Sequence, residues 1–417
     1  MRTIMFFKYC LLIAVALPSL AIAQTNNTQS EVEPISTPEW VVVLDDPRPA
    51  RLQGWVNRGY GKSSSGNYRS ALELERFGKA VANKYKMELR DQWFIPSLGV
   101  YCLIVRFNQD QNTTIAQLKK NKSVQWVQPS NEFELLSASV TPKLTENAPI
   151  TQASTQATVQ ASVHSIKPGI DGSGVVIAII DSAIDDSHQD LTGQIDKVGD
   201  FVITRERRSA GKKQQSGESH GTAIAGVMVS DINTKLGVAG VAPAATLQAY
   251  RACWEASETK QTNCNTLSLA RALDAVLNSQ ADILNLSLSG PKDRLLDRLL
   301  QRIIDRGTIV VTAFDPKRPQ RSRFPSERDG VIVVRAAGLD KQHSGFTAPG
   351  ARVVASPGNN YNFMHGHSVA SAYTSGLLAL RKQISDSGRK LSDANNDWRE
   401  VSPNSAAQEL LDEIHQY

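Results

Sequence analysis

The chain has 417 residues, of which 41% are hydrophobic, 21% charged and only 6% aromatic, and its formal net charge is +5. At roughly 100 to 200 residues per domain, this length predicts two or three domains. The composition excludes a small disulfide-stapled protein, a disordered chain and a coiled coil. Because 46 basic residues nearly balance 41 acidic ones, the charge gives no reason to expect nucleic-acid binding.

The first 23 residues have the features of a secretory signal peptide. Arg2 and Lys8 precede an apolar run over residues 10–17, and the small residues Ala21 and Ala23 form a cleavage site. The run is shorter than the about 20 apolar residues that a membrane span needs, and no later stretch is apolar enough. We expect an exported protein, periplasmic or extracellular, with no membrane span after cleavage and with residues 24–38 disordered.

Three cysteines remain after removal of this leader. Cys253 and Cys264 flank a polar segment, and a disulfide between them would restrain a surface loop in an exported protein. Two unrelated thiols are the alternative. Cys102 lies in an apolar run and is expected to be a small core residue.

Residues 39–136 are predicted to form a small α+β unit. Strands are expected at 40–45, 93–95, 100–107 and 124–127, and helices within 68–86 and around 114–120. This is the βαββαβ order of ferredoxin-like units. The following residues, 137–163, are rich in Ser, Thr, Ala and Gln, which predicts an exposed linker that a protease could cut.

Residues 164–417 are predicted to form an α/β domain with a C-terminal helical extension. Its β-branched runs lack alternation, which is typical of parallel strands buried on both faces; they cover 174–180, 283–288, 308–312 and 331–335. Helices are expected at 221–230, 267–278, 293–306 and 369–384. This alternation predicts a doubly wound, mostly parallel sheet, with ligands bound at the carboxyl ends of its strands.

Three motifs, one at the end of a predicted strand and two at the starts of predicted helices, carry a carboxyl group, an imidazole and a hydroxyl group. Asp181 ends a predicted strand, whereas His220 and Ser368 each begin a predicted helix. Amide hydrolysis by a hydroxyl nucleophile needs an imidazole base and a carboxylate that orients the imidazole. At a helix start, the backbone N–H of Ser368 would also be suited to stabilising an oxyanion.

These motifs, in this order, resemble those of the subtilisin-like serine peptidases. The resemblance covers about residues 165–382 and includes Ala348-Pro-Gly350, which matches the A-P-G motif of the family. It implies a subtilisin-like fold and a polypeptide substrate. It also implies that a segment similar to the family's N-x-S-L-G-G-P lines the substrate cleft, through Ser287, Leu288, Ser289 and Gly290.

The same resemblance gives the N-terminal unit a role. Members of the family commonly carry a ferredoxin-like propeptide that assists folding, occupies the cleft and is cut away. Residues 39–136 are similar to such a propeptide in the order of their elements, so the chain's own propeptide is an expected partner. An independent binding domain is the alternative.

Several positions depart from the family's motifs, although none of them removes a triad group; they are Ala183, Ala223, His367, Val369 and Ala372. The most consequential departure is Asp315, which stands where the family has an Asn that donates a hydrogen bond to the oxyanion. A carboxyl group can donate only when it is protonated. We therefore expect a protonated Asp315 to form the oxyanion site together with the N–H of Ser368.

Two other classes of function are compatible with parts of the sequence. His365, His367 and His343 would be candidate ligands of a metal-dependent hydrolase, but they lack metal-ligand spacing. We predict no metal site and no certain cofactor; calcium often stabilises the family and stays open, because no ligand set can be named. A catalytically weak or inactive peptide-binding scaffold is the second alternative, supported by Asp315, His367 and Ala372.

The sequence thus predicts a secreted or periplasmic serine endopeptidase that acts through Asp181, His220 and Ser368 and an acyl-enzyme, and that is made as a self-processed precursor.

Overall fold

The computed structural model describes residues 38–47, 65–136, 139–141, 169–202, 218–231, 239–255, 261–317, 323–339, 345–388 and 407–415. The expected signal peptide and most of the expected linker lie outside these ranges. None of the helices within them has the length and apolar character that crossing a lipid bilayer requires.

The N-terminal unit follows the expected βαββαβ order. Its elements are β1 (Trp40–Asp45), α2 (Ser65–Lys84), β2 (Met87–Ile95), β3 (Val100–Phe107), α3 (Gln111–Lys119) and β4 (Val124–Pro129). They form an antiparallel sheet in the order β2-β3-β1-β4. Strand β2 begins six residues earlier than expected, because polar side chains mask its pattern. Cys102 is fully buried in β3, as predicted.

The larger α/β domain is built on seven parallel strands, which confirms the predicted fold class. The strands are β7 (Val176–Asp181), β8 (Ile195–Asp200), β9 (Thr246–Arg251), β12 (Ile283–Leu286), β14 (Ile309–Ala313), β16 (Val331–Ala336) and β17 (Phe346–Ala348). Their order is β17-β16-β14-β12-β7-β9-β8.

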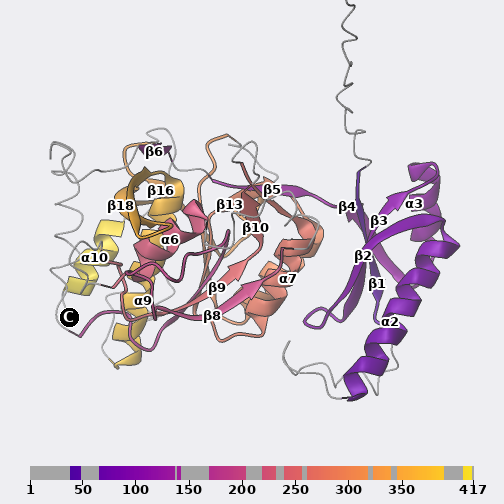
Figure 1. The fold of residues 1–417 in the computed structure, drawn as a ribbon, viewed down its shortest axis with the longest axis horizontal. Coiled ribbons are helices and arrows are strands. Elements are labelled where there is room, and N and C mark those ends of the chain that lie inside the picture. Colours follow the sequence, from indigo (N-terminus) through magenta and orange to yellow (C-terminus); the bar gives the residue numbers. More distant parts are fainter. Residues whose placement is uncertain are drawn as a thin grey trace, which may run out of the picture. The chain divides into compact units, whose positions relative to one another are not determined.

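Helices cover both faces of this sheet (Figure 1). On one face, Ile177 and Ile179 of β7 pack in a core with α6 (Ser219–Val229), α9 (His367–Asp386) and α10 (Ala407–His415). On the other face, Ala178 and Ile180 join a core with α7 (Thr266–Leu277) and α8 (Arg294–Asp305). Neighbouring residues of β7 thus enter opposite cores, as expected for a strand buried on both faces.

Helix α8 shows how the sequence forms a layer of this domain. An apolar stripe along one side of this helix is buried, through Leu295, Leu296, Leu299, Leu300 and Ile303. Asp293 caps its start by accepting hydrogen bonds from the backbone N–H groups of Leu295 and Leu296, at 3.0 and 3.1 Å. The stripe buries one face of the helix, and the cap satisfies its first donors.

Two small antiparallel sheets include strands that were not expected from the sequence. One has the order β10-β11-β5-β13-β15, from β10 (Cys253–Glu255), β11 (Thr262–Asn265), β5 (Glu132–Leu135), β13 (Leu288–Pro291) and β15 (Arg323–Phe324). The other has the order β18-β19-β6, from β18 (Ala351–Ser356), β19 (Asn360–His365) and β6 (Ser139–Thr141). Residues 139–141 therefore differ from the expectation of an exposed linker: they form a strand.

Candidate active site

Asp181 and His220 form a buried hydrogen-bonded pair. Asp181 ends β7 and His220 lies in the first turn of α6. The Nδ1 atom of His220 lies 2.8 and 3.0 Å from the two carboxylate oxygens of Asp181. The backbone N–H of Ser182 also donates to Asp181, at 2.7 Å. Because the carboxylate accepts, Nδ1 carries the hydrogen of the neutral ring and Nε2 is left as the basic nitrogen.

Gly221 and Ser182 allow β7 and α6 to meet so closely. A Cβ atom on Gly221 would lie 2.6 Å from the carbonyl oxygen of Ser182, so only glycine fits here. The backbone N–H of Gly221 donates to the hydroxyl of Ser182 at 3.0 Å. The motifs mark both residues, but only the structure reveals this tie between the base and the acid.

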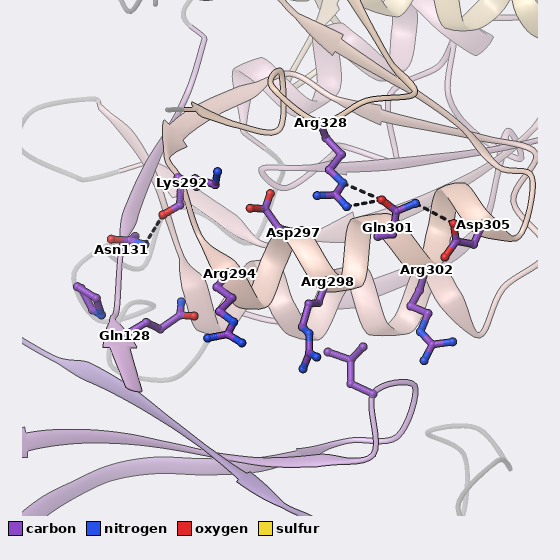
Figure 2. Close-up of a pocket in the computed structure, with 12 residues that line it drawn as sticks. Gln128, Asn131, Lys292, Arg294, Asp297, Arg298, Gln301, Arg302, Asp305 and Arg328 are labelled. Carbon is purple, nitrogen blue, oxygen red and sulfur yellow. Dashed lines mark hydrogen bonds between the residues drawn. The ribbon is translucent and has the colours of Figure 1, made fainter. Parts of the chain in front are cut away.

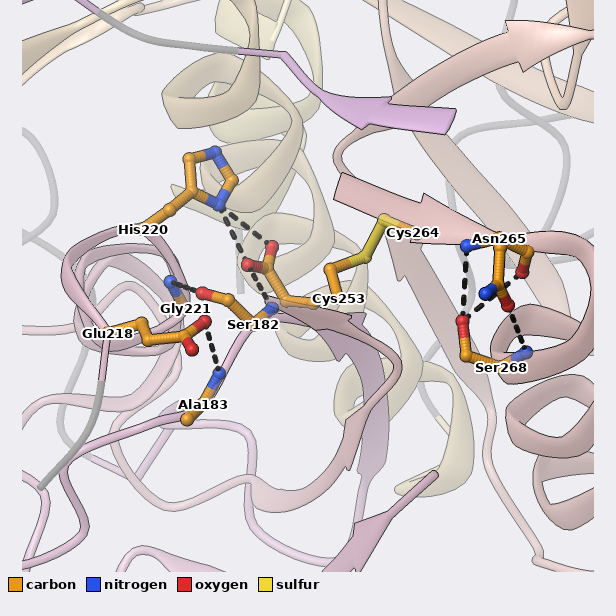
Figure 3. The surroundings of a disulfide bond; sticks show 10 residues. Ser182, Ala183, Glu218, His220, Gly221, Cys253, Cys264, Asn265 and Ser268 are labelled. Carbon is orange, nitrogen blue, oxygen red and sulfur yellow. Dashed lines mark hydrogen bonds and ion pairs between the residues drawn. A yellow bond between two sulfur atoms is a disulfide. The ribbon is translucent and has the colours of Figure 1, made fainter. Parts of the chain in front are cut away.

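Glu218 adds a second tie that no motif indicates. Its carboxylate accepts a hydrogen bond from the backbone N–H of Ala183, at 3.3 Å, and one from Arg251, at 2.8 Å. Arg251 lies opposite Asp181 in the neighbouring strand. Burial raises the pKa of Glu218, although the Arg251 guanidinium opposes that effect. The residue before the catalytic helix is therefore joined to the end of β7 on the side away from His220 (Figure 3).

The pKa of His220 reflects two opposing influences. Burial alone would lower it, but the Asp181 carboxylate, its hydrogen bond and the nearby carbonyl of Leu136 outweigh burial, so the pKa of His220 is raised. A raised pKa means that the charged imidazolium is favoured. That is the form a general base takes after it has accepted a proton.

Ser368 is fully buried in the first turn of α9 and faces the same carbonyl. Its Oγ donates a hydrogen bond to the carbonyl oxygen of Leu136, at 2.6 Å. Among the described residues, Nε2 of His220 has no hydrogen-bond partner. The carbonyl of Leu136 therefore accepts its hydrogen bond from Ser368, although it also lies near enough to His220 to raise the pKa of that ring. For attack, the hydroxyl must turn its hydrogen from this carbonyl to Nε2.

Asn285 helps to anchor the helix that carries Ser368. Its side-chain amide, on β12, donates to the hydroxyl of Ser375 at 3.0 Å. The hydroxyl of Ser287 lies 3.1 Å from both the Asn285 oxygen and the Ser371 hydroxyl. These buried contacts connect α9 to the segment that leads into β13.

Strand β5 runs towards Ser368 between β11 and β13, and the space that it fills between these two strands is called the groove. It pairs with β13 on one side and β11 on the other. The backbone N–H of Leu136 donates to the carbonyl of Ser287 at 2.9 Å. Leu288 lies opposite Leu135, and Ser289 opposite Glu134. The four predicted substrate-binding residues, Ser287, Leu288, Ser289 and Gly290, therefore lie along one edge of β5.

Gly290 makes room for the side chain of Phe133. A Cβ atom at Gly290 would lie 2.0 Å from the Phe133 ring. That ring is 1% exposed and packs edge-on against Phe324, with centroids 5.8 Å apart. The groove thus accepts an aromatic side chain three residues before Leu136.

Asp315 follows β14 and is 3% exposed. Its Oδ1 accepts a hydrogen bond from the backbone N–H of Lys317 at 2.9 Å, and its carbonyl accepts one from Arg323 at 3.2 Å. The preceding Phe314 ring meets the ring of His367 edge-on at 5.4 Å. This contact brings the end of β14 to the start of the helix that bears Ser368.

The candidate metal ligands do not form a site in the described residues. Nδ1 of His367 accepts a hydrogen bond from the backbone N–H of Ala336 at 2.9 Å, so this atom holds the start of α9. His365 ends β19, and His343 lies outside the described ranges. Within those ranges, no three His, Cys, Asp or Glu side chains gather as metal ligands would.

A disulfide joins Cys253 and Cys264 at the back of the groove (Figure 3). The two residues lie opposite each other in the β10–β11 pair, with Cα atoms 4.3 Å apart. Cys264 also lies opposite Phe133 of β5. Cys253 follows the end of β9, where the N–H of Ala252 donates to the carbonyl of Asp181 at 3.0 Å. The disulfide therefore links the end of β9, beside Asp181, to β11, the strand that borders the groove on its outer side.

A separate cavity of about 800 Å³ lies along α8 (Figure 2). Arg294, Arg298 and Arg302 project from one side of the helix, and Gln128 and Asn131 of the N-terminal part also line the cavity. None of the predicted site residues lines it. It belongs to the contact between residues 38–136 and α8.

The comparisons with known proteins agree with this geometry. The model of the subtilase family matches residues 172–414. The chain is 30% identical over 220 residues to a thermophilic serine proteinase of Bacillus sp. (strain AK1), covering 50% of this chain and 52% of that protein. It is 29% identical over 235 residues to subtilisin E of Bacillus subtilis (strain 168), covering 52% and 58%. The chain spans little more than half the length of these relatives.

A solved structure supports the fold. Fervidolysin from Fervidobacterium pennivorans, a keratinolytic enzyme related to subtilisin, superimposes with a TM-score of 0.61 at 15% identity. The match covers 92% of this chain and 61% of that one. Since the family model covers more than half of its residues, the chain belongs to the subtilase family.

Proposed function

We propose that the chain is the precursor of a serine endopeptidase that first cleaves its own bond between Leu136 and Ser137. One observation carries this proposal: Oγ of Ser368 lies 2.6 Å from the carbonyl oxygen of Leu136, while the N–H of Leu136 is held by Ser287 at 2.9 Å. The peptide bond that follows Leu136 is thus presented to the nucleophile as a substrate would be.

The reaction follows from the roles of the three side chains. His220 takes the proton of Ser368 as Oγ attacks the carbonyl carbon of Leu136, and Asp181 stabilises the charged ring. In the proposed site, the oxyanion accepts hydrogen bonds from the N–H of Ser368 and from the carboxyl group of Asp315. The C–N bond to Ser137 breaks as His220 returns the proton to the leaving amine. Water, activated by His220, then hydrolyses the acyl-enzyme.

We assign residues 39–136 as the propeptide that delivers this bond. Several contacts with the larger domain support the assignment. The amide of Gln128 donates to the buried carboxylate of Asp293 at 2.8 Å, and that of Asn131 donates to the same group at 2.9 Å. The ring of Trp126 lies against Arg294 and Arg298, whose guanidinium carbons are 4.6 and 4.8 Å from its centroid.

More contacts of this kind lie along α7. Arg271 pairs with Asp91 at 3.3 Å, and Ser97 hydrogen-bonds to Asp274. The unit thus contacts α7 and α8 as well as inserting β5. An independent binding domain would not need to place its last residues at the nucleophile.

After processing, other polypeptides would bind where β5 lies, as a strand between β11 and β13. We propose that this happens outside the cytoplasm, in the periplasm or extracellular medium. The leader-like first 23 residues and the Cys253–Cys264 disulfide support export.

The test compares the wild-type chain with Ser368→Ala. After expression, intact mass and N-terminal sequencing should show a wild-type fragment that begins at Ser137, whereas Ser368→Ala stays whole. Ser385→Ala is a matched control, because Ser385 lies near the opposite end of α9 from Ser368, and it should still be processed. Equal cleavage of wild type and Ser368→Ala, or none in either, would sink the proposal.

A peptide-binding scaffold without activity is the second candidate. It is favoured by the hydrogen bond of Ser368 to Leu136 instead of His220, and by a carboxyl group at Asp315. Labelling with a serine-directed fluorophosphonate separates the two. An active enzyme reacts at Ser368, and a chelator does not prevent the reaction; a scaffold stays unlabelled.

A further inference from the structure

On the other side of the proposed scissile bond from β5, the chain forms β6, and this strand pairs with β19. Residues 139–141 of β6 pair with it in antiparallel register: Ser139 lies opposite His365, Val140 opposite Met364, and Thr141 opposite Phe363. Counted from the bond after Leu136, these are the third to fifth residues of the leaving part. Both halves of the chain around this bond are therefore held as strands.

The position of β19 connects this pairing to the chemistry. Its last residue, His365, is separated from Ser368 by only Gly366 and His367. One edge of β19 is fully paired with β18, from Asn360 to His365. Only the other edge is open to a peptide strand, and it leads towards the nucleophile.

The far end of β19 is fixed before any peptide binds. It is tied to the loop that follows Asp181: Gly358 donates to Asp185 at 2.7 Å, and Gln189 donates its backbone N–H to Asn359 at 2.7 Å. Tyr361 also donates its hydroxyl to Asp190, at 2.8 Å. An edge held in this way need not be ordered by its ligand, which reduces the cost of binding.

We propose that this edge of β19 is an extended subsite for the part of a polypeptide that follows the scissile bond. It would bind the third to fifth residues after the bond by strand addition, through main-chain hydrogen bonds, and so accept most side chains but not proline. This proposal rests on the proposed function, with β6 as the first occupant of the subsite.

The first test uses peptides and the self-processed enzyme. All of them contain Glu-Phe-Glu-Leu-Leu before the bond, and they extend either two or five residues beyond it. We expect kcat/KM to rise about 10-fold with the longer extension. In an antiparallel ladder, alternate residues donate to a given neighbour. N-methylation should therefore remove the gain at the third and fifth residues or at the fourth, but not at all three.

Equal kcat/KM for both lengths, or no effect of any N-methyl group, would overturn the proposal. If no peptide of either length is cleaved, it is the proposed function that fails, and a readout without catalysis decides the subsite. In full-length Ser368→Ala, hydrogen exchange should show protection of alternate amides in residues 139–141. Uniformly fast exchange there would also reject the subsite.

A matched pair of variants completes the test in the intact chain. Val140→Pro removes an N–H group from the middle of β6 and should slow self-cleavage after Leu136. Val159→Pro makes the same change outside the strand and should leave the rate unchanged. If the two variants process at the same rate, the pairing with β19 does not assist the reaction.

Discussion

The two halves of the groove hold the chain in different ways. Before the scissile bond, β5 lies between β11 and β13 and buries the side chains of Phe133 and Leu135. After the bond, β6 has a single neighbour, β19. The first half therefore recognises side chains as well as backbone, whereas the second holds the chain through the backbone pairing of β6 with β19. Selectivity should come from the residues before the bond, and the fragment after the bond should leave first.

The largest expected effect lies between the two halves, at Asp315. One oxyanion donor contributes about 10²–10³ in kcat, so Asp315→Leu should lose an amount of this order with little change in KM. The loss should be the same for peptides extended on either side. Asp315→Asn should keep the activity, because the side-chain amide can donate a hydrogen bond to the oxyanion. Steady-state kinetics of the three proteins checks this.

If Asp315→Leu keeps full kcat, or if Asp315→Asn loses as much kcat as Asp315→Leu, the oxyanion role of Asp315 is wrong.

The next effect tests the half before the bond. Gly290→Ala places a Cβ atom where the Phe133 ring lies. Losing the burial of this ring costs about 2–3 kcal/mol, which corresponds to a fall of roughly 30- to 150-fold in the first-order rate constant of self-cleavage. The rate of self-cleavage measures it. Phe133→Ala combined with Gly290→Ala should lose less than the sum of the two single changes.

Additive losses in that double-mutant cycle would mean that Gly290 and Phe133 do not interact. The inference that the half before the bond recognises side chains would then be wrong.

A smaller effect concerns the outer wall of the same half. Replacing Cys253 and Cys264 by Ser should loosen β11, the outer neighbour of β5. We expect KM to rise ~5- to 10-fold for peptides that reach β11, because the strand must then be ordered on binding. A short ester that fills only the position next to the bond should keep its KM. Cys102→Ala, a change of a cysteine in the N-terminal unit, is the control. Equal effects on ester and peptide would indicate general destabilisation instead.

The smallest effect is a shift in pH dependence. Burial lowers the pKa of His220, but Asp181 and the Leu136 carbonyl raise it more. The base works only when neutral, so self-cleavage should fall with decreasing pH around a midpoint above the ordinary value of about 6.5. A midpoint of self-cleavage at or below the ordinary value of about 6.5 would contradict this account.

The parts of the fold that sequence predicts well have strong local patterns. The stripe of α8 follows helical spacing, and the β-branched run of β7 continues until Asp181. Strand β9 was not expected, because Gln248 and Arg251 break its apolar run. Its burial is decided by neighbouring strands, which a local pattern does not contain.

The residues of the candidate site also differ in how well the sequence predicts them. Asp181, His220 and Ser368 stand in compact motifs, so the order of amino acids alone singles them out. Glu218 has no such motif, since its role depends on Arg251 from another strand. Strand β5 is also not predicted from the sequence, although Glu132–Leu135 alternates exposed and buried residues. Both of its neighbours come from more than a hundred residues away, and the linker-like composition after it hides β6.

The covalent connection of β5 to its own groove has a consequence for kinetics. While the chain is whole, the local concentration of this strand does not fall when the protein is diluted, so the proposed self-cleavage should be first order in protein. Once the bond is cut, the same segment becomes an ordinary ligand, and its occupancy of the groove depends on its concentration. The rate of the first turnover should therefore not depend on the protein concentration, whereas dilution should favour release of the cleaved segment.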